Sequence, residues 1–166
     1  MGTKEEARLT MRVVDLSSQA IGDVGVRALV PVLQMAVVTK LYLVNNAISD
    51  AGAQCLAEGL RYARGLQVLH LNNNEILDEG AHKIAMACES LPVIATLNLS
   101  HNPFGFVGTK SIATFLSQST CRLKSLALSG CLNSGLPWKT IHPKVASKLK
   151  RFGDDGAICV AAALIN

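Results

Sequence analysis

Residues 38–60 read VTKLYLVNNAISDAGAQCLAEGL, and residues 66–88 read LQVLHLNNNEILDEGAHKIAMAC. The two stretches share apolar residues at the first, fourth and sixth positions, Asn at the ninth, and Asp-x-Gly from the thirteenth. The pattern begins five times, with steps of 27, 28, 28 and 29 residues, at Met11, Val38, Leu66, Ile94 and Leu123. A period of this length is typical of a solenoid, in which each repeat packs only on its neighbours.

The first half of each repeat predicts a short β-strand followed by a tight bend. Apolar residues two positions apart, as in the stretch 41–43, place both side chains on one face of a strand. The Asn that follows can satisfy backbone groups in the bend through its side-chain amide. We therefore expect Asn46, Asn74 and Asn102 to form a ladder of buried amides, with Cys131 as an accepted substitute in the fifth repeat.

The second half of each repeat predicts a helix. Apolar residues recur there at helical spacing, behind Asp-x-Gly motifs that begin at Asp23, Asp50, Asp78 and Asp154. We expect each Asp to be the N-cap of its own helix. Pro31 falls inside the first helix and is expected to kink or shorten it, because proline removes a backbone hydrogen bond.

One strand and one helix per repeat predict an α/β solenoid with parallel strands on the concave face and helices on the convex face. The pattern LxxLxLxxNxIxDxGxxxLxxxL resembles the long leucine-rich repeat of the ribonuclease-inhibitor type, a subclass that includes Ran GTPase-activating proteins and the repeat domains of NOD-like receptors. The resemblance covers roughly residues 11–166 and implies a single horseshoe-shaped domain over residues 1–166. For function it implies a display surface, because unrelated partners use this fold.

Composition predicts an aliphatic core, because 49% of the residues are hydrophobic and only 4% are aromatic. No apolar run is long enough to span a bilayer, and residues 1–6 lack the apolar stretch of a signal peptide. The five cysteines include no Cys-x-x-Cys pair, so we interpret them as small hydrophobic residues in a reducing cytoplasm. We expect no metal and no cofactor.

A basic insertion interrupts the fifth repeat. The helix glycine should fall at Pro137 but comes at Gly156, so 156 − 137 = 19 residues have been added. The segment 133–153 holds five basic residues and no acidic one, in a chain of net charge +4. Its candidate partner-binding residues are Trp138, Lys139, Lys144, Lys148, Lys150 and Arg151.

Such a segment suits an acidic partner, which could be a nucleic acid backbone, an acidic protein tail or an anionic membrane surface. We favour an acidic protein surface, because nothing here resembles a nucleic-acid module. The alternative is a solvated loop in which Trp138 folds back on the flank of the solenoid.

The outward positions of the strands form a second candidate surface. Neighbouring strands lie about 4.8 Å apart, so equivalent residues are side by side, and Tyr is a frequent interface anchor. The candidate residues on this concave face are Asp15, Lys40, Tyr42, His70 and Asn98. No nucleophile or second metal ligand is spaced to work with His70, so we predict no catalytic or metal site. The other histidines, His82, His101 and His142, are interpreted as solvated.

These features predict a non-catalytic protein–protein interaction module, a scaffold or adaptor of a larger assembly such as a cytoskeletal or ciliary one. We expect partner proteins rather than a small-molecule substrate. We also expect either a longer repeat array or neighbouring subunits that cover the ends.

Two alternatives remain open. A GTPase activator of the Ran-activating type would work through an arginine on a loop between strand and helix, and the first four such loops contain none. A repeat fragment of a NOD-like receptor would need an upstream nucleotide-binding domain, and no P-loop motif occurs in these residues.

Overall fold

The structure, a computed structural model, describes residues 12–35 and 37–131. Strands and helices alternate along this part of the chain: β1 (Val13–Asp15), α1 (Gly22–Met35), β2 (Lys40–Tyr42), α2 (Asp50–Leu60), β3 (Val68–His70), α3 (Asp78–Glu89), β4 (Thr96–Asn98), α4 (Phe106–Ser117) and β5 (Ser125–Ala127). The basic insertion 133–153 and the helix predicted after Asp154 lie outside the described residues.

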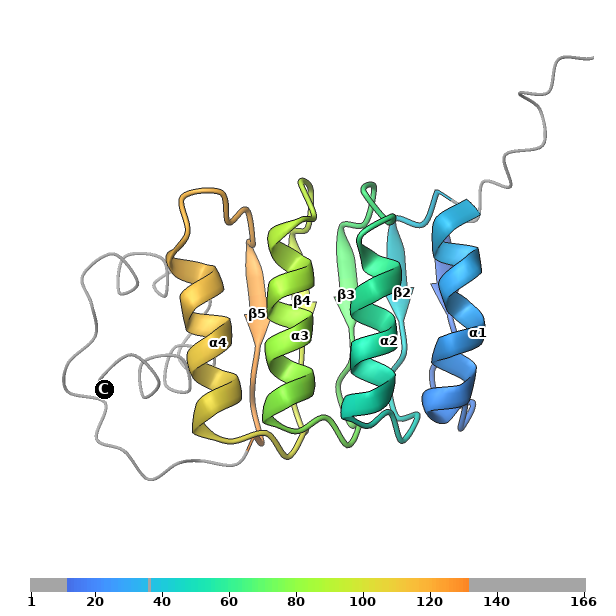
Figure 1. The fold of residues 1–166 in the computed structure, drawn as a ribbon, viewed down its shortest axis with the longest axis horizontal. Helices are drawn as coiled ribbons and strands as arrows, with labels where there is room; N and C mark the ends of the chain where they lie inside the picture. Colours follow the sequence, from blue (N-terminus) through green and yellow to red (C-terminus); the bar gives the residue numbers. More distant parts are fainter. Residues whose placement is uncertain (1–11, 36, 132–166) are drawn as a thin grey trace, which may run out of the picture.

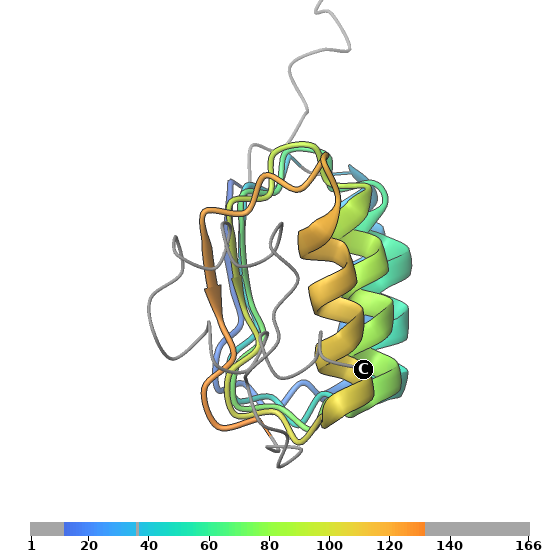
Figure 2. The ribbon, with the colours of Figure 1, turned by 90° about the vertical axis from the view of Figure 1, so that its left-hand side faces the viewer.

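The strands form one parallel sheet in the order β1-β2-β3-β4-β5. Helices α1 to α4 lie side by side along the sheet (Figure 1), and strands and helices form two separate layers (Figure 2). The middle residues of the strands are aligned from repeat to repeat as Val14, Leu41, Leu69, Leu97 and Leu126. The predicted leucine-rich-repeat solenoid is therefore confirmed.

An aliphatic core fills the space between the two layers. The middle strand residues are all buried, as are the apolar residues that open the repeats, such as Leu66 and Ile94. From the other side, helices contribute buried residues at helical spacing, including Leu56 and Leu60 in α2. Burial of apolar side chains contributes roughly 25 cal/mol per Å², so this continuous core is the main stabilising term of the fold.

The predicted ladder of buried amides is confirmed. Asn74 is 6% exposed, and its Oδ1 accepts hydrogen bonds from the backbone N–H groups of Asn46 at 2.9 Å and Ile48 at 3.1 Å. Its Nδ2 donates to the carbonyl oxygens of Leu43 and Leu71, both at 2.9 Å. One side chain thus pairs four backbone groups of two repeats, groups whose burial without partners would be costly.

The same contacts recur along the solenoid. Asn46 Oδ1 accepts from Gln19 and Ile21 of the first repeat, and Asn102 Oδ1 accepts from Ile76 of the third. In the fifth repeat the thiol of Cys131 lies 3.6 Å from the Leu99 carbonyl oxygen. A thiol reproduces the donor half of the amide, so Cys131 is a partial substitute for asparagine.

The prediction that each aspartate caps its own helix is wrong. The N-cap of α2 is Ser49 and that of α3 is Leu77, which has no capping side chain. Instead, Asp50 Oδ1 accepts hydrogen bonds from the N–H groups of Leu77 at 2.7 Å and Gly80 at 2.8 Å, in the following repeat. A carboxylate near a helix N-terminus is stabilised by the helix dipole, whichever repeat supplies it.

Asp78 and Asp23 act in the same direction. Asp78 Oδ1 accepts from the N–H groups of Gly105 and Gly108 at the start of α4, at 2.8 and 2.7 Å. Asp23 accepts from both the N–H and the hydroxyl of Ser49, at 2.9 and 2.6 Å. Each aspartate therefore fastens its own repeat to the start of the next helix.

The glycine of the Asp-x-Gly motif makes room for this carboxylate. A Cβ atom on Gly80 would overlap Asp50 Oδ1 and would also lie 2.9 Å from Cγ2 of Ile76 and 3.0 Å from Cβ of Ala53. The carboxylate of Asp50, in the preceding repeat, therefore requires a glycine at position 80.

Pro31 does not shorten α1, and a kink at Pro31, the other predicted effect, stays a prediction. This helix has 14 residues, whereas α2 has 11 and α3 has 12. Pro31 is exposed on the helix surface.

We expect Asn74→Ala to lower the free energy of unfolding by about 3 kcal/mol, because several buried backbone groups lose their partner together. Urea unfolding monitored by circular dichroism measures this loss. The matched control is Asn72→Ala, since among the described residues Asn72 Oδ1 is buried without a hydrogen-bond partner, and we expect it to cost less than about 1 kcal/mol. Equal losses in the two variants would contradict the ladder.

We expect Asp50→Ala and Gly80→Ala to be coupled by about 1 kcal/mol in a double-mutant cycle, because removing the carboxylate also removes part of the steric conflict. Gly80→Ala retains some cost in the double variant, owing to its contact with Ile76. The control cycle combines Gly80→Ala with Asp78→Ala and should be additive. If Gly80 were coupled to Asp78 instead, Asp78 would cap its own helix, α3, as the sequence predicts.

Candidate functional site

The sheet brings the predicted concave-face residues together on the side away from the helices. Strand register aligns Asp15 with Tyr42, Tyr42 with His70, and His70 with Asn98. Lys40 lies in the neighbouring column, aligned with Val13 and Val68 of the adjacent strands, and it is exposed. The structure therefore confirms the predicted placement, while partner binding by these residues stays a prediction.

Tyr42 and His70 form the centre of this face. Their ring centroids are 5.0 Å apart and their planes meet at 87°, an edge-to-face arrangement. Such pairs are attractive, because the positive edge of one ring meets the negative face of the other. Both side chains are half-buried, so the ring contact restrains them while part of each ring stays accessible to a partner.

Burial lowers the pKa of His70 from its ordinary value of 6.5, because a desolvated imidazolium is less stable than the neutral ring. At neutral pH the ring is therefore uncharged and has one nitrogen that donates and one that accepts. A partner would meet a neutral polar and aromatic centre here, with the positive charge of Lys40 at one side.

Asp15 and Asn98 lie on either side of Tyr42 and His70 on the strand face, and both form hydrogen bonds within their own repeats. The Asp15 carboxylate accepts a hydrogen bond from the N–H of Ser17 at 3.0 Å, and hydrogen bonding by Ser17 lowers the pKa of Asp15. Asn98 Oδ1 likewise accepts from the N–H of Ser100 at 3.0 Å. These oxygens stabilise the turn after the strand, so Tyr42 and His70 remain the side chains best placed to contact a partner.

Asn72 belongs to the same face and was not among the predicted site residues. It follows β3 by two residues, and its Oδ1 is buried without a hydrogen-bond partner within residues 12–35 and 37–131. A buried acceptor without a partner carries a desolvation cost, which a donor that reaches it would remove. The strand pattern already places Asn72 at an outward position, but only the fold shows that its Oδ1, unlike that of the neighbouring Asn74, is buried without a partner in this part of the chain.

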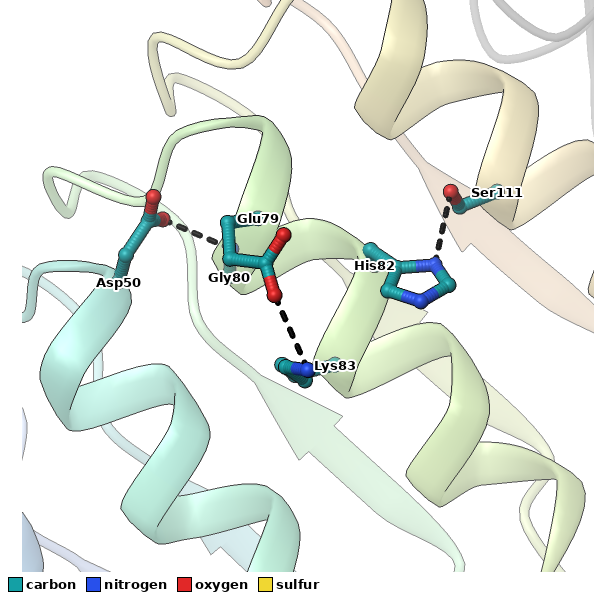
Figure 3. A network of polar contacts seen from close by, with 6 residues as sticks. All are labelled: Asp50, Glu79, Gly80, His82, Lys83 and Ser111. Atoms are coloured by element: carbon teal, nitrogen blue, oxygen red, sulfur yellow. Dashed lines mark hydrogen bonds and ion pairs between the residues drawn. The ribbon is translucent and has the colours of Figure 1, made fainter.

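The convex face carries polar contacts within and between helices, shown in Figure 3. His82 Nδ1 of α3 lies 3.1 Å from the Ser111 hydroxyl of α4, and Lys83 forms a 3.0 Å ion pair with Glu79. The interpretation of His82 as merely solvated is therefore wrong. The Ser111 hydroxyl also donates to the Val107 carbonyl oxygen at 3.1 Å, so this pair joins two helices and shows no third group that would support catalysis.

The described part of the chain shows no cluster of metal ligands, and its fully buried cysteine, Cys88, has no activated thiol. No three His, Cys, Asp or Glu side chains within it are grouped to hold a metal ion. Burial raises the pKa of Cys88 to about 12, which keeps its thiol protonated and unreactive. Among the same residues, no helix has the length and apolar character needed to cross a bilayer.

Comparison with known proteins gives the same repeat. A family model described as "Leucine Rich repeat" matches residues 9–30, 34–57 and 64–85. A relative from Bos taurus, "NACHT, LRR and PYD domains-containing protein 3", is 35% identical over 91 residues. The match covers 54% of this chain but 9% of the relative, so it concerns the repeats and not the whole activity of that protein.

A solved structure supports the fold independently. The protein named "Leiomodin-1 Actin-Binding Site 2 (ABS2)" superimposes with a TM-score of 0.65 at 22% sequence identity. The superposition covers 71% of this chain and 70% of that chain. At this identity the likeness concerns the arrangement of strands and helices, not the residues that bind a partner.

We expect Tyr42→Ala to raise the pKa of His70 towards 6.5, because the substitution opens the ring to water. In the wild type the lowered pKa means that the unfolded chain binds a proton more readily. The free energy of unfolding should therefore fall as the pH drops below about 6.5. Two-dimensional NMR of the imidazole during a pH titration measures the shift.

The control for this titration is Tyr62→Ala. Tyr62 is 60% exposed and lies in the loop after α2, outside the strands that carry the aromatic pair. An equal shift of His70 in both variants would show that Tyr42 does not shield the ring.

Proposed function

We propose that this chain, a leucine-rich-repeat protein of the ribonuclease-inhibitor type, is a non-catalytic scaffold or adaptor that holds partner proteins in a larger assembly. The repeat family and the fold are generally those of protein-interaction modules. The observation that carries the proposal is the strand face with its edge-to-face pair, Tyr42 and His70. Tyrosine held in this way loses little conformational freedom when a partner covers it, which favours an interface anchor.

The contact would be polar and weakly charged at its centre. The neutral ring of His70 offers a donor and an acceptor, and Lys40 adds one positive charge. The residues aligned with this pair on the neighbouring strands are Asp15 and Asn98, and neither carries a hydroxyl or thiol nucleophile. We therefore propose binding rather than chemistry for this face.

The basic insertion 133–153 would supply a second contact. Its five cations suit an acidic protein surface, and long-range attraction would mainly raise the rate of association. We propose Trp138 as the apolar anchor of this segment, beside Lys139, Lys144, Lys148, Lys150 and Arg151. The ends of the repeat array would be covered by neighbouring repeats or subunits.

A cytoskeletal setting in the cytoplasm, including the cilium, is our proposal for location. The structural neighbour is named for an actin-binding site, and this motivates actin as the first partner to test. Cosedimentation of the purified 166-residue chain with filamentous actin tests this setting directly. A chain that stays in the supernatant over a wide range of actin concentrations would remove actin as the partner.

The second candidate is the repeat portion of a NOD-like receptor, which the similarity to the bovine relative favours. A gene that places a nucleotide-binding domain before these repeats would support it. For the GTPase-activator alternative, the described loops 16–21, 43–49, 71–77 and 99–105 contain no arginine. Stimulated GTP hydrolysis by a panel of small GTPases would reverse our preference.

We expect the double variant Tyr42→Ala/His70→Ala to weaken binding of the partner by at least about tenfold, since central aromatic residues often dominate interface energies. Cross-linking mass spectrometry in cells identifies partners, and titration of each purified partner gives the affinities. Deletion of 133–153 measures the second contact separately.

The matched control for this titration is Tyr62→Ala, which removes an exposed tyrosine outside the strand face. Binding that survives both the double variant and the deletion would contradict the proposed surfaces. Circular dichroism of each variant separates lost contacts from lost folding.

A further inference from the structure

One edge of the solenoid is basic. We call it the loop edge: it contains the helix-to-strand segments 37–40, 61–67, 89–95 and 117–124, together with the residue before β1. Its exposed cations are Arg12, Lys40, Arg61, Arg64, Arg122 and Lys124. The one carboxylate in these described segments is that of Glu89, which accepts a 2.6 Å hydrogen bond from the side-chain amide of Gln118.

The opposite edge, where strands end and helices begin, is acidic. Its described segments 15–23, 44–52, 72–80 and 100–108 contain no Lys or Arg, and their carboxylates belong to Asp15, Asp23, Asp50, Glu75, Asp78 and Glu79. Helix N-termini favour such groups, and three of the aspartates cap helices. The acidic edge thus has a structural explanation within the fold.

The helix dipole does not explain in the same way the two cations that flank the start of the fifth repeat at Leu123. Arg122 and Lys124 come five and seven residues after Ser117, the last residue of α4. The dipole acts within the last turn of a helix, so these two residues lie beyond its reach along the chain. Both side chains are exposed, and the described contacts include no ion pair for either.

These two cations line a groove in the loop edge. The groove has a volume of about 870 Å³ and is formed by residues of three successive repeats, including Gln67, Pro92, Val93, Cys121, Arg122 and Lys124. Val93 is 43% exposed, so an aliphatic side chain is open to a partner in this groove. None of the lining residues carries a carboxylate, so apolar surface and positive charge stand together.

We propose that this loop-edge groove binds an acidic peptide segment of a partner protein. Carboxylates of the segment would pair with Arg122 and Lys124, and an apolar side chain between them would pack on Pro92 and Val93. Arginine binds carboxylates in a two-pronged geometry and lysine as a point charge, so the pair favours carboxylates over uncharged groups. The inference deepens the proposed interaction function and uses a surface separate from Tyr42 and His70.

Other occupants fit the groove less well. The basic insertion 133–153 of this chain carries five cations, which Arg122 and Lys124 would repel. The capping aspartates of a second copy already accept hydrogen bonds inside their own fold. A single-stranded nucleic acid would need aromatic side chains for base stacking, and the groove lining contains none.

The test is a fluorescence anisotropy titration with the full 166-residue chain. The probe is a fluorescein-labelled peptide in which pairs of glutamates alternate with leucines, and the comparison probes replace glutamate by lysine or leucine by serine. The binding variant is Arg122→Glu/Lys124→Glu. The matched control, Arg27→Glu/Lys110→Glu, makes the same change in net charge at exposed positions on α1 and α4.

We expect the glutamate–leucine peptide to bind the wild type, and the groove variant to bind it at least about fivefold more weakly. The control variant and Tyr42→Ala should bind as the wild type does, which separates this groove from the strand face. Val93→Ser should weaken the leucine-containing probe and leave the serine-containing probe unchanged.

The proposal would be overturned by no binding of the peptide or by equal weakening in the groove and control variants. Tighter binding of an oligothymidylate than of the peptide, with the same dependence on Arg122 and Lys124, would also overturn it. Loss of binding in Tyr42→Ala alone would place the peptide on the strand face. That result would spare the proposed function while rejecting the groove.

Discussion

The fold depends on the buried side-chain amide that follows each strand. A bend inside a stack of repeats buries backbone N–H and carbonyl groups, and these need partners. Asn74 supplies them for its own repeat and for the one before, through bonds to Ile48, Leu43 and Leu71 among others. A repeat is therefore complete only when the next repeat is in place, which makes the array cooperative between neighbours.

The aspartates add a coupling in the opposite direction. Asn74 of the third repeat reaches back to the second, whereas Asp50 of the second reaches forward to the start of α3 at Gly80. Each of the first three repeats is thus fastened to the next one at both the bend and the helix start. The asparagine, aspartate and glycine of one motif have partners in different repeats, which is why they recur with a fixed spacing.

Asparagine and aspartate side chains that bond to neighbouring repeats are not available to partner proteins. The surface is therefore divided into regions that serve the fold and regions that can bind a partner. The carboxylates at helix starts serve as caps, and Asp15 and Asn98 serve the turns after their strands. The aromatic pair on the strand face stays partly accessible, and the cations and the apolar Val93 of the loop edge are exposed. The stacking that stabilises the repeats thus leaves two chemically different surfaces for the proposed interactions.

The sequence by itself determined the repeats, the strands, their register and the amide ladder, because these follow from apolar spacing and from one Asn per period. It also placed Tyr42 beside His70, since equal positions in successive repeats become neighbours. Only the tertiary structure decided that Asp50 caps α3, that His82 meets Ser111, and that Arg122 and Lys124 share a groove with Val93. Each of these depends on the rotation and distance between stacked repeats, which the pattern within one repeat does not contain.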